Sequence, residues 1–188
     1  MIRVDPAPEP ADFDTLVRQP GLAQLPGLDP LWRDCLPELL AAYHRICACS
    51  CFYIHPVTGA KTVEHFARKS ATPALAYEWT NYRLVCGLMN SRKLVFDDVL
   101  DPFDVETGWF VLDFALGEVR PNAALAIDHA AVQATIDRLR LNDPPCPGTR
   151  LEELGHYRDG DWSWRELCRV SPFVAAEADR QGLRRPND

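Results

Sequence analysis

Sixteen prolines among 188 residues limit how much regular structure this chain can form. Proline has no backbone N–H donor and a fixed φ, so it interrupts helix interiors and central strands. Six of these prolines lie within the first 30 residues, where apolar residues show little periodicity. We therefore predict a proline-rich arm over residues 1–30, mostly irregular with at most a short helix around Asp12–Gln19, and a single domain over residues 31–188.

The composition is typical of a globular protein with a core of its own. Hydrophobic residues make up 47% of the chain and charged residues 25%. No uninterrupted apolar run approaches the length of a membrane span, and the first residues lack the apolar segment of a signal peptide. Seven cysteines, an odd number, argue against a disulfide framework. These features predict a cytoplasmic protein that does not enter a membrane.

The charge is distributed unevenly along the sequence. The formal net charge is -7, which argues against extensive coating of nucleic acid, because phosphate binding relies on a cationic surface. Residues 61–93 nevertheless contain six basic and two acidic residues, a local net charge of +4 that leaves −11 for the rest of the chain. A small cationic site on an acidic body can still bind one phosphate backbone.

Helix signals follow the arm. Asp29 can cap a helix, and Pro30 suits its first position. Apolar residues then recur at helical spacing over residues 32–46, where Pro37 either kinks the helix or restarts it. This apolar stripe predicts a core-facing helix.

The centre of the chain predicts strands next to a helix. Strand propensity is high over residues 51–55, Thr62–Phe66 and Tyr82–Cys86, and residues 87–93 can begin a helix. A turn signal at residues 56–59 separates the first two strands. Two strands and a helix around one site form a ββα arrangement, with its motif core over residues 47–95.

The last third of the chain carries its own hairpin and helix signals. A hairpin is predicted around Gly117, and a helix over residues 128–140 is followed by a helical cover. The predicted fold class is α+β, with a ββα finger embedded in a mostly helical single domain and an extra β-hairpin. The hairpin and the C-terminal helices occupy residues 105–188.

Residues 62–93 also hold the side chains with the strongest chemical signal. Glu64 and His65 are adjacent, and Asn81 and Asn90 follow at a spacing of nine residues. A carboxylate and an amide oxygen can hold a divalent cation, and a neighbouring histidine can deprotonate water. Singly, each residue is better explained as a core or capping residue, but the four together indicate a phosphodiesterase site.

At these positions the chain resembles HNH endonucleases, whose motif is the ββα-metal finger. The matching stretches are E-H-F-A-R-K-S, W-T-N-Y-R-L-V-C and M-N-S-R-K, which are similar to HNH effectors of bacterial anti-phage cassettes of the Septu and retron-associated types. Their pattern is roughly E-H-F-x-P-K, W-x-N-L and C-x-x-C-N-x-x-K. With a later similarity up to Arg150, the resemblance covers residues 31–150.

The resemblance implies roles for individual residues. His65 matches the general base and Asn81 the asparagine that orients it, so both are candidate catalytic residues. Glu64 and Asn90 match the metal ligands of a single weak site for Mg²⁺, Mn²⁺ or Ni²⁺ that is completed by water and substrate phosphate. The residues expected to contact nucleic-acid phosphate are Lys69, Arg92 and Lys93.

The sequence departs from the family pattern in its cysteines. Many HNH proteins hold a structural zinc ion with two C-x-x-C pairs, but here Met89 stands where the second pair has its last thiolate. Cys47, Cys49 and Cys51 alternate and would share one face of a strand, where apolar packing explains them. We therefore expect no structural zinc; a site formed by some of these cysteines with Cys86 is the alternative.

The resemblance implies a metal-dependent endonuclease that hydrolyses phosphodiester bonds in DNA, with RNA not excluded, as a bacterial defence effector. It also implies an ATPase partner protein that presents the nucleic acid or controls cleavage. The alternative is a catalytically decayed HNH-fold protein that acts as a nucleic-acid-binding or assembly subunit. The acidic surface and the missing cysteine favour this alternative, whereas the four motif residues favour the nuclease.

Overall fold

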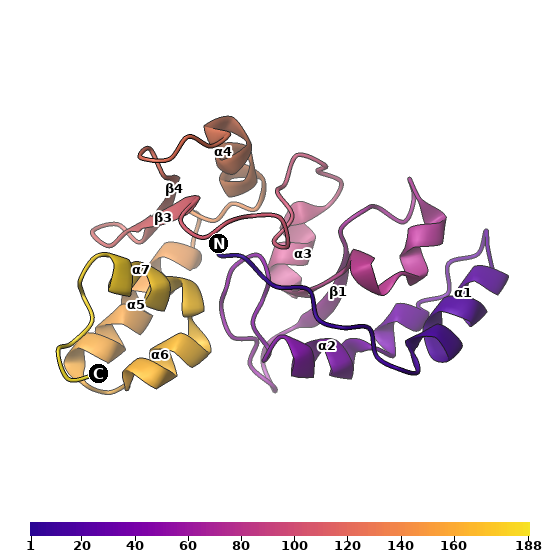
Figure 1. Cartoon of the computed structure of the whole chain (residues 1–188), viewed down its shortest axis with the longest axis horizontal. Helices are drawn as coiled ribbons and strands as arrows, with labels where there is room; N and C mark the ends of the chain where they lie inside the picture. Colours follow the sequence, from indigo (N-terminus) through magenta and orange to yellow (C-terminus); the bar gives the residue numbers. More distant parts are fainter. The chain divides into compact units, whose positions relative to one another are not determined.

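The computed structural model describes all residues, 1–188, as a mixed α+β structure with two small antiparallel sheets. Its contacts divide the chain into two compact units (Figure 1). The N-terminal unit comprises Asp5–Ala48 and Ile54–Asp97, and the C-terminal unit comprises Met1–Val4, Cys49–Tyr53 and Asp98–Asp188. Where the sequence predicted one domain after an arm, each unit has its own two-stranded sheet, and the arm from Asp5 onward is part of the N-terminal unit.

The N-terminal unit begins with short helical segments. A π-helical turn, η1 (Asp14–Arg18), continues into α1 (Gln19–Ala23), so the short helix predicted in the arm is present. The 3₁₀ turn η2 (Leu31–Arg33) and the helix α2 (Leu36–Ala42) follow. Pro37 lies in the first turn of α2, where a missing N–H costs nothing, so the proline restarts the helix and does not kink it.

The sheet of this unit pairs β1 (Lys61–His65) with β2 (Tyr82–Cys86) in antiparallel register. Two 3₁₀ turns, η3 (Pro73–Tyr77) and η4 (Trp79–Asn81), lie between the strands, and α3 (Gly87–Lys93) follows β2 directly. A Cβ at Gly87 would lie 2.9 Å from that of Ala60, so the turn into α3 favours glycine. The buried residues of β2 pack into a core that includes Leu39, Leu84 and Met89.

The predicted strand over residues 51–55 is wrong. Tyr53 is only an isolated bridge residue, and its N–H donates to the carbonyl of Val170. Cys51 has a φ of +59°, which ends extended backbone at that residue. The strand that pairs with β1 is β2, which follows β1 in the sequence, and residues 51–55 before β1 do not pair with it.

The C-terminal unit contains the hairpin predicted around Gly117, formed by β3 (Phe110–Asp113) and β4 (Glu118–Pro121). Gly117 has a φ of +72°, and a Cβ there would lie 2.4 Å from the carbonyl oxygen of Pro147. Both the backbone conformation and the lack of space therefore require glycine. The predicted helix is α4 (His129–Arg138), and the Asp128 side chain caps it by accepting from the N–H of Ala131.

Three further helices complete this unit: α5 (Cys146–Asp159), α6 (Trp164–Val170) and α7 (Pro172–Arg180) (Figure 1). They form the helical cover that the sequence predicted. Their inward side chains include Leu154, Leu167 and Phe173, all buried. None of the helices in the chain has the length and apolar character needed to cross a membrane.

Candidate active site

Glu64 and His65 are the last two residues of β1, where they pair with Arg83 and Tyr82 of β2. Both residues are buried: Glu64 is 8% exposed and His65 6%. They line an open pocket of about 380 Å³ together with Asn90 of α3. Three of the four motif residues found in the sequence therefore meet at one pocket of the N-terminal unit.

His65 is held by its distal ring nitrogen. Nε2 lies 3.0 Å from the carbonyl oxygen of Ala76, and because a carbonyl only accepts, Nε2 carries the proton. Nδ1 is consequently the nitrogen with the lone pair. Trp32 and Tyr82 pack edge-on against the imidazole, with ring centroids at 4.7 and 5.1 Å. The ring therefore has a fixed orientation and a fixed tautomer.

The surroundings of His65 keep it neutral. Burial above all, together with the positive charges of Lys69 and Lys93, lowers its pKa to about 4, and only the bond to Ala76 acts in the opposite direction. At neutral pH the imidazole is unprotonated at Nδ1. Such a group can accept a proton.

The Asn81 side chain makes no hydrogen bond to His65. Its Oδ1 accepts from the N–H of Ala67 at 2.7 Å, and its Nδ2 donates to the carbonyls of Ala67 at 3.1 Å and Leu75 at 2.9 Å. One side chain thus holds both ends of the loop over residues 67–75, which we call the Asn81-clamped loop. The loop ends next to Ala76, so Asn81 acts on His65 only through the backbone that the imidazole binds.

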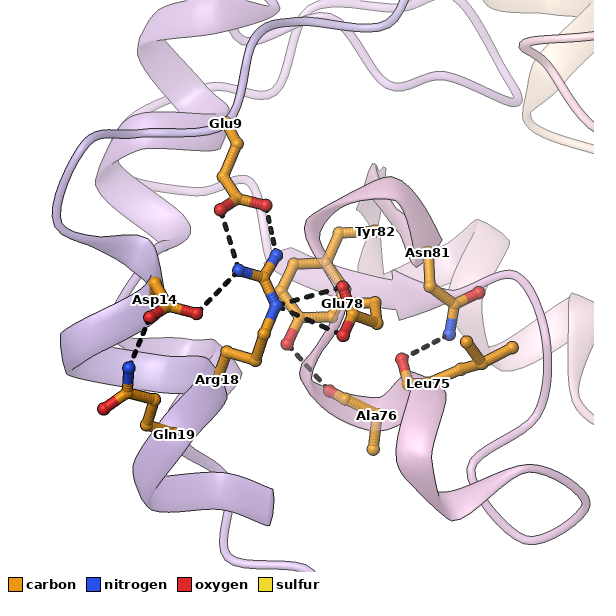
Figure 2. A network of polar contacts seen from close by, with 9 residues as sticks. All are labelled: Glu9, Asp14, Arg18, Gln19, Leu75, Ala76, Glu78, Asn81 and Tyr82. Carbon is orange, nitrogen blue, oxygen red and sulfur yellow. Dashed lines mark hydrogen bonds and ion pairs between the residues drawn. The ribbon is translucent and has the colours of Figure 1, made fainter.

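A wider polar network supports the same backbone (Figure 2). The hydroxyl of Tyr82 donates to the carbonyl of Ala76 at 2.7 Å, so this oxygen accepts from two side chains. Arg18 of η1 donates through Nε to both carboxylate oxygens of Glu78 at 3.1 Å and also binds Glu9. The segment that carries the Ala76 carbonyl is therefore fixed from β2, from the arm and by Asn81.

Glu64 forms a buried ion pair. The ammonium of Lys93 lies 2.9 Å from Oε1 and also donates to the carbonyl of Phe66 at 3.3 Å. Burial raises the pKa of Glu64, and Lys93 opposes this shift. Lys93 is only 3% exposed. The sequence predicted Lys93 as a phosphate contact, but its ammonium points at Glu64 and the backbone, away from solvent.

Two other cationic residues, Arg68 and Lys69, do line the pocket. The ammonium of Lys69 lies 3.9 Å from the centre of the Trp32 ring, a cation–π contact. Arg68 donates to Asp97 at 2.5 Å, and its buried Nε has no partner. Arg92, the third predicted phosphate contact, lies on α3 and is not part of the pocket lining.

The oxygen donors of the pocket fit one weakly held divalent cation. Oε2 of Glu64 accepts no hydrogen bond within the protein, and the side-chain amide of Asn90 makes no hydrogen bond there either. Mg²⁺ commonly binds one or two protein oxygens and keeps several waters. No group of three His, Cys, Asp or Glu residues is placed to hold a metal ion. Glu64 and Asn90 would therefore need water and substrate oxygens to complete a coordination shell.

None of the seven cysteines forms a disulfide bond. Cys47 is buried in the N-terminal unit, where its sulfur accepts from the N–H of Cys86 at 3.3 Å. Met89, which stands at the position of a zinc thiolate in the family pattern, is three residues after Cys86 and is buried in the core. These residues pack the base of β2 and α3.

Sequence reasoning missed the residues that tune the imidazole. Trp32 was assigned to a core stripe, yet it contacts both His65 and Lys69. The Ala76 carbonyl has no side-chain signature at all. Only Tyr82, directly after Asn81, offered a signal, because a buried phenol requires a hydrogen-bond partner nearby, and here that partner is the Ala76 carbonyl.

No protein-family model matches the chain. No curated protein sequence is significantly similar to it.

Proposed function

We propose that the chain is a metal-dependent endonuclease of the HNH type that hydrolyses phosphodiester bonds in DNA. The observation that supports this most directly is the state of His65: a neutral imidazole, fixed through Nε2 and unprotonated at Nδ1, in a residue that lines a pocket together with Glu64 and Asn90. The paired strands β1 and β2 and the helix α3 have the chain order of a ββα-metal finger, and β1 and α3 contribute residues to this pocket.

In this proposal His65 is the general base. Nδ1 accepts a proton from the attacking water as the water oxygen bonds to phosphorus, and the leaving oxygen takes a proton from solvent as the P–O bond breaks. The low pKa of the free site makes His65 a weak base, and the charge of a bound phosphate raises that pKa. Substrate binding thus brings the imidazole closer to the pKa that proton transfer needs.

Lys69 and Arg68 are the residues that would bind phosphate at the pocket. Both have partners in the protein, Trp32 and Asp97, that fix their positions before substrate binds. Glu64 Oε2 and Asn90 would hold the cation. When bound, the metal ion supplies Lewis-acid stabilisation of the scissile phosphate and of the leaving oxygen.

Plasmid nicking with Mg²⁺, Mn²⁺ or Ni²⁺ tests the proposal. We expect His65→Ala to lower the rate by at least about 100-fold, as for loss of a general base. The matched control is His55→Ala, in an exposed turn of the same unit, which should keep full activity. Equal cleavage by His65→Ala and wild type would refute the role of His65.

Calorimetry tests the metal ligands separately. Titration with Mn²⁺ should show one weak site that is lost in Glu64→Gln. Unchanged binding in that variant would place the metal elsewhere.

The Glu64–Lys93 pair favours a second candidate function, a nucleic-acid-binding or assembly subunit that does not cleave. In this case the ammonium of Lys93 keeps Glu64 neutralised, and a cation cannot compete for the carboxylate. Binding of DNA without cleavage under any metal would support it. Co-expression with an ATPase partner, as expected for a defence cassette, distinguishes a decayed site from one that a partner activates.

A further inference from the structure

The walls of the pocket have two different chemistries. Arg68, Lys69 and Ser70 form a cationic and polar side next to the Glu64–His65 floor. Leu94 and Val95, directly after α3, form an apolar side together with Val63. A ligand that matches this pocket has an anionic part and an apolar part next to each other.

Leu94 and Val95 are two consecutive apolar residues that are well exposed to solvent. Their exposed fractions are 64% and 65%, although both line the pocket. Leu94 also has a φ of +45° with a ψ of −113°, a conformation that is strained for any residue with a Cβ. Strain and exposure together at a pocket wall indicate a surface kept for a ligand, because packing within the protein does not explain them.

We propose that this pocket takes an unpaired nucleotide, with its phosphate at Arg68 and Lys69 and its base against Leu94 and Val95. The inference rests on the proposed function and specifies its substrate as single-stranded nucleic acid. In a duplex the base faces are stacked and only backbone and groove edges are accessible, so a base can cover an apolar wall only when it leaves the stack. The pocket volume of about 380 Å³ lies within the range of sites for small ligands.

The charge of the chain supports the same substrate. Duplex DNA has a high linear charge density, and its binding depends on many phosphate contacts. A chain of net charge -7 with two cationic side chains at its pocket offers few such contacts. A flexible single strand can enter a pocket and add apolar contacts to a small number of phosphate contacts.

Fluorescence anisotropy with short labelled oligonucleotides tests the proposal without requiring cleavage. The probes are an oligothymidylate, an RNA of matched length and a hairpin duplex, each measured with Mn²⁺ and the full chain. We expect the single strands to bind at least about tenfold more tightly than the duplex, consistent with the contribution of base contacts. The DNA and RNA arms show which sugar the site accepts.

Paired variants identify the apolar wall. Leu94→Ser with Val95→Ser should weaken single-strand binding at least about fivefold and leave duplex binding unchanged. The matched control is Leu88→Ser, which removes a leucine of α3 that is 41% exposed and does not line the pocket.

The outcomes separate this inference from the proposed function. Equal binding of duplex and single strand, or no effect of the wall variants, would overturn the inference even if His65-dependent nicking occurs. Tight single-strand binding that depends on Leu94 and Val95, without any cleavage, would support the inference and refute the nuclease.

Discussion

The Glu64–Lys93 ion pair allows a stability prediction that does not depend on function. We expect Lys93→Met to destabilise the chain by about 3–5 kcal/mol, because it leaves a buried carboxylate without its counter-charge. The side chains are 11% and 4% exposed, so solvent screens the pair little. A surface pair of the same kind would contribute about 1 kcal/mol or less.

A double-mutant cycle isolates this interaction. Glu64→Gln removes the charge of the carboxyl side chain, so Lys93→Met should cost much less in its presence, and we expect a coupling energy of at least about 2 kcal/mol. The assay is urea unfolding of the full chain, followed by both fluorescence and circular dichroism to establish whether one transition is present.

The pH dependence of the same variant provides a second readout. The pKa of Glu64 is already raised by burial, and loss of Lys93 raises it further. The folded state then binds a proton that the unfolded state releases, so the destabilisation by Lys93→Met should grow as pH rises above the unfolded pKa and shrink in acid. A coupling energy below about 0.5 kcal/mol, or a loss that does not change with pH, would refute the buried-pair reasoning.

Three further predictions follow from the contacts of single residues. His65 has a pKa of about 4 in the folded state, so its contribution to stability, up to about 3 kcal/mol, is present above pH 6.5 and lost as pH falls toward 4. The pKa of Glu153, about 7, has the opposite effect on stability. The difference in unfolding free energy between wild type and His65→Gln, measured against pH, separates the two. Asn81→Ala should destabilise by about 2–4 kcal/mol and expose the clamped loop to trypsin, because buried backbone groups lose their partners; resistance equal to wild type would contradict this. Gly117→Ala should destabilise the chain clearly more than Gly182→Ala, for which we expect a loss of about 1–2 kcal/mol. Both glycines have a positive φ, but only Gly117 also lacks space for a Cβ atom. The melting temperatures of the two variants measure the difference.

Local signals account for the elements that the sequence predicted correctly. The hairpin around Gly117, the helix capped by Asp128 and the strands β1 and β2 each depend on residues within a few positions of one another. The prediction of a strand over residues 51–55 was wrong because strand formation depends on pairing partners that are distant in the sequence. Its propensity was high, but β2 is the partner of β1, and the positive φ of Cys51 has no signal in residue type.

The candidate site divides in the same way. The adjacency of Glu64 and His65 and their proximity to Asn90 could be predicted, because strand and helix signals surround them. The direction of the Lys93 side chain could not be predicted, because a lysine at the end of a helix is normally solvated. Only the tertiary structure places its ammonium beside Glu64. The tautomer of His65 depends on the backbone carbonyl of Ala76, which every residue type provides equally.

The Asn81-clamped loop has a consequence for how the site can change. A single amide fastens the backbone at Ala67 and at Leu75, and the side chains between these two points take no part in those hydrogen bonds. Arg68 and Lys69 belong to this interval, whereas the carbonyl that holds His65 lies just outside it. Under the proposed function, side chains within the loop can therefore be exchanged to change the phosphate contacts while the hydrogen bond that positions His65 stays in place.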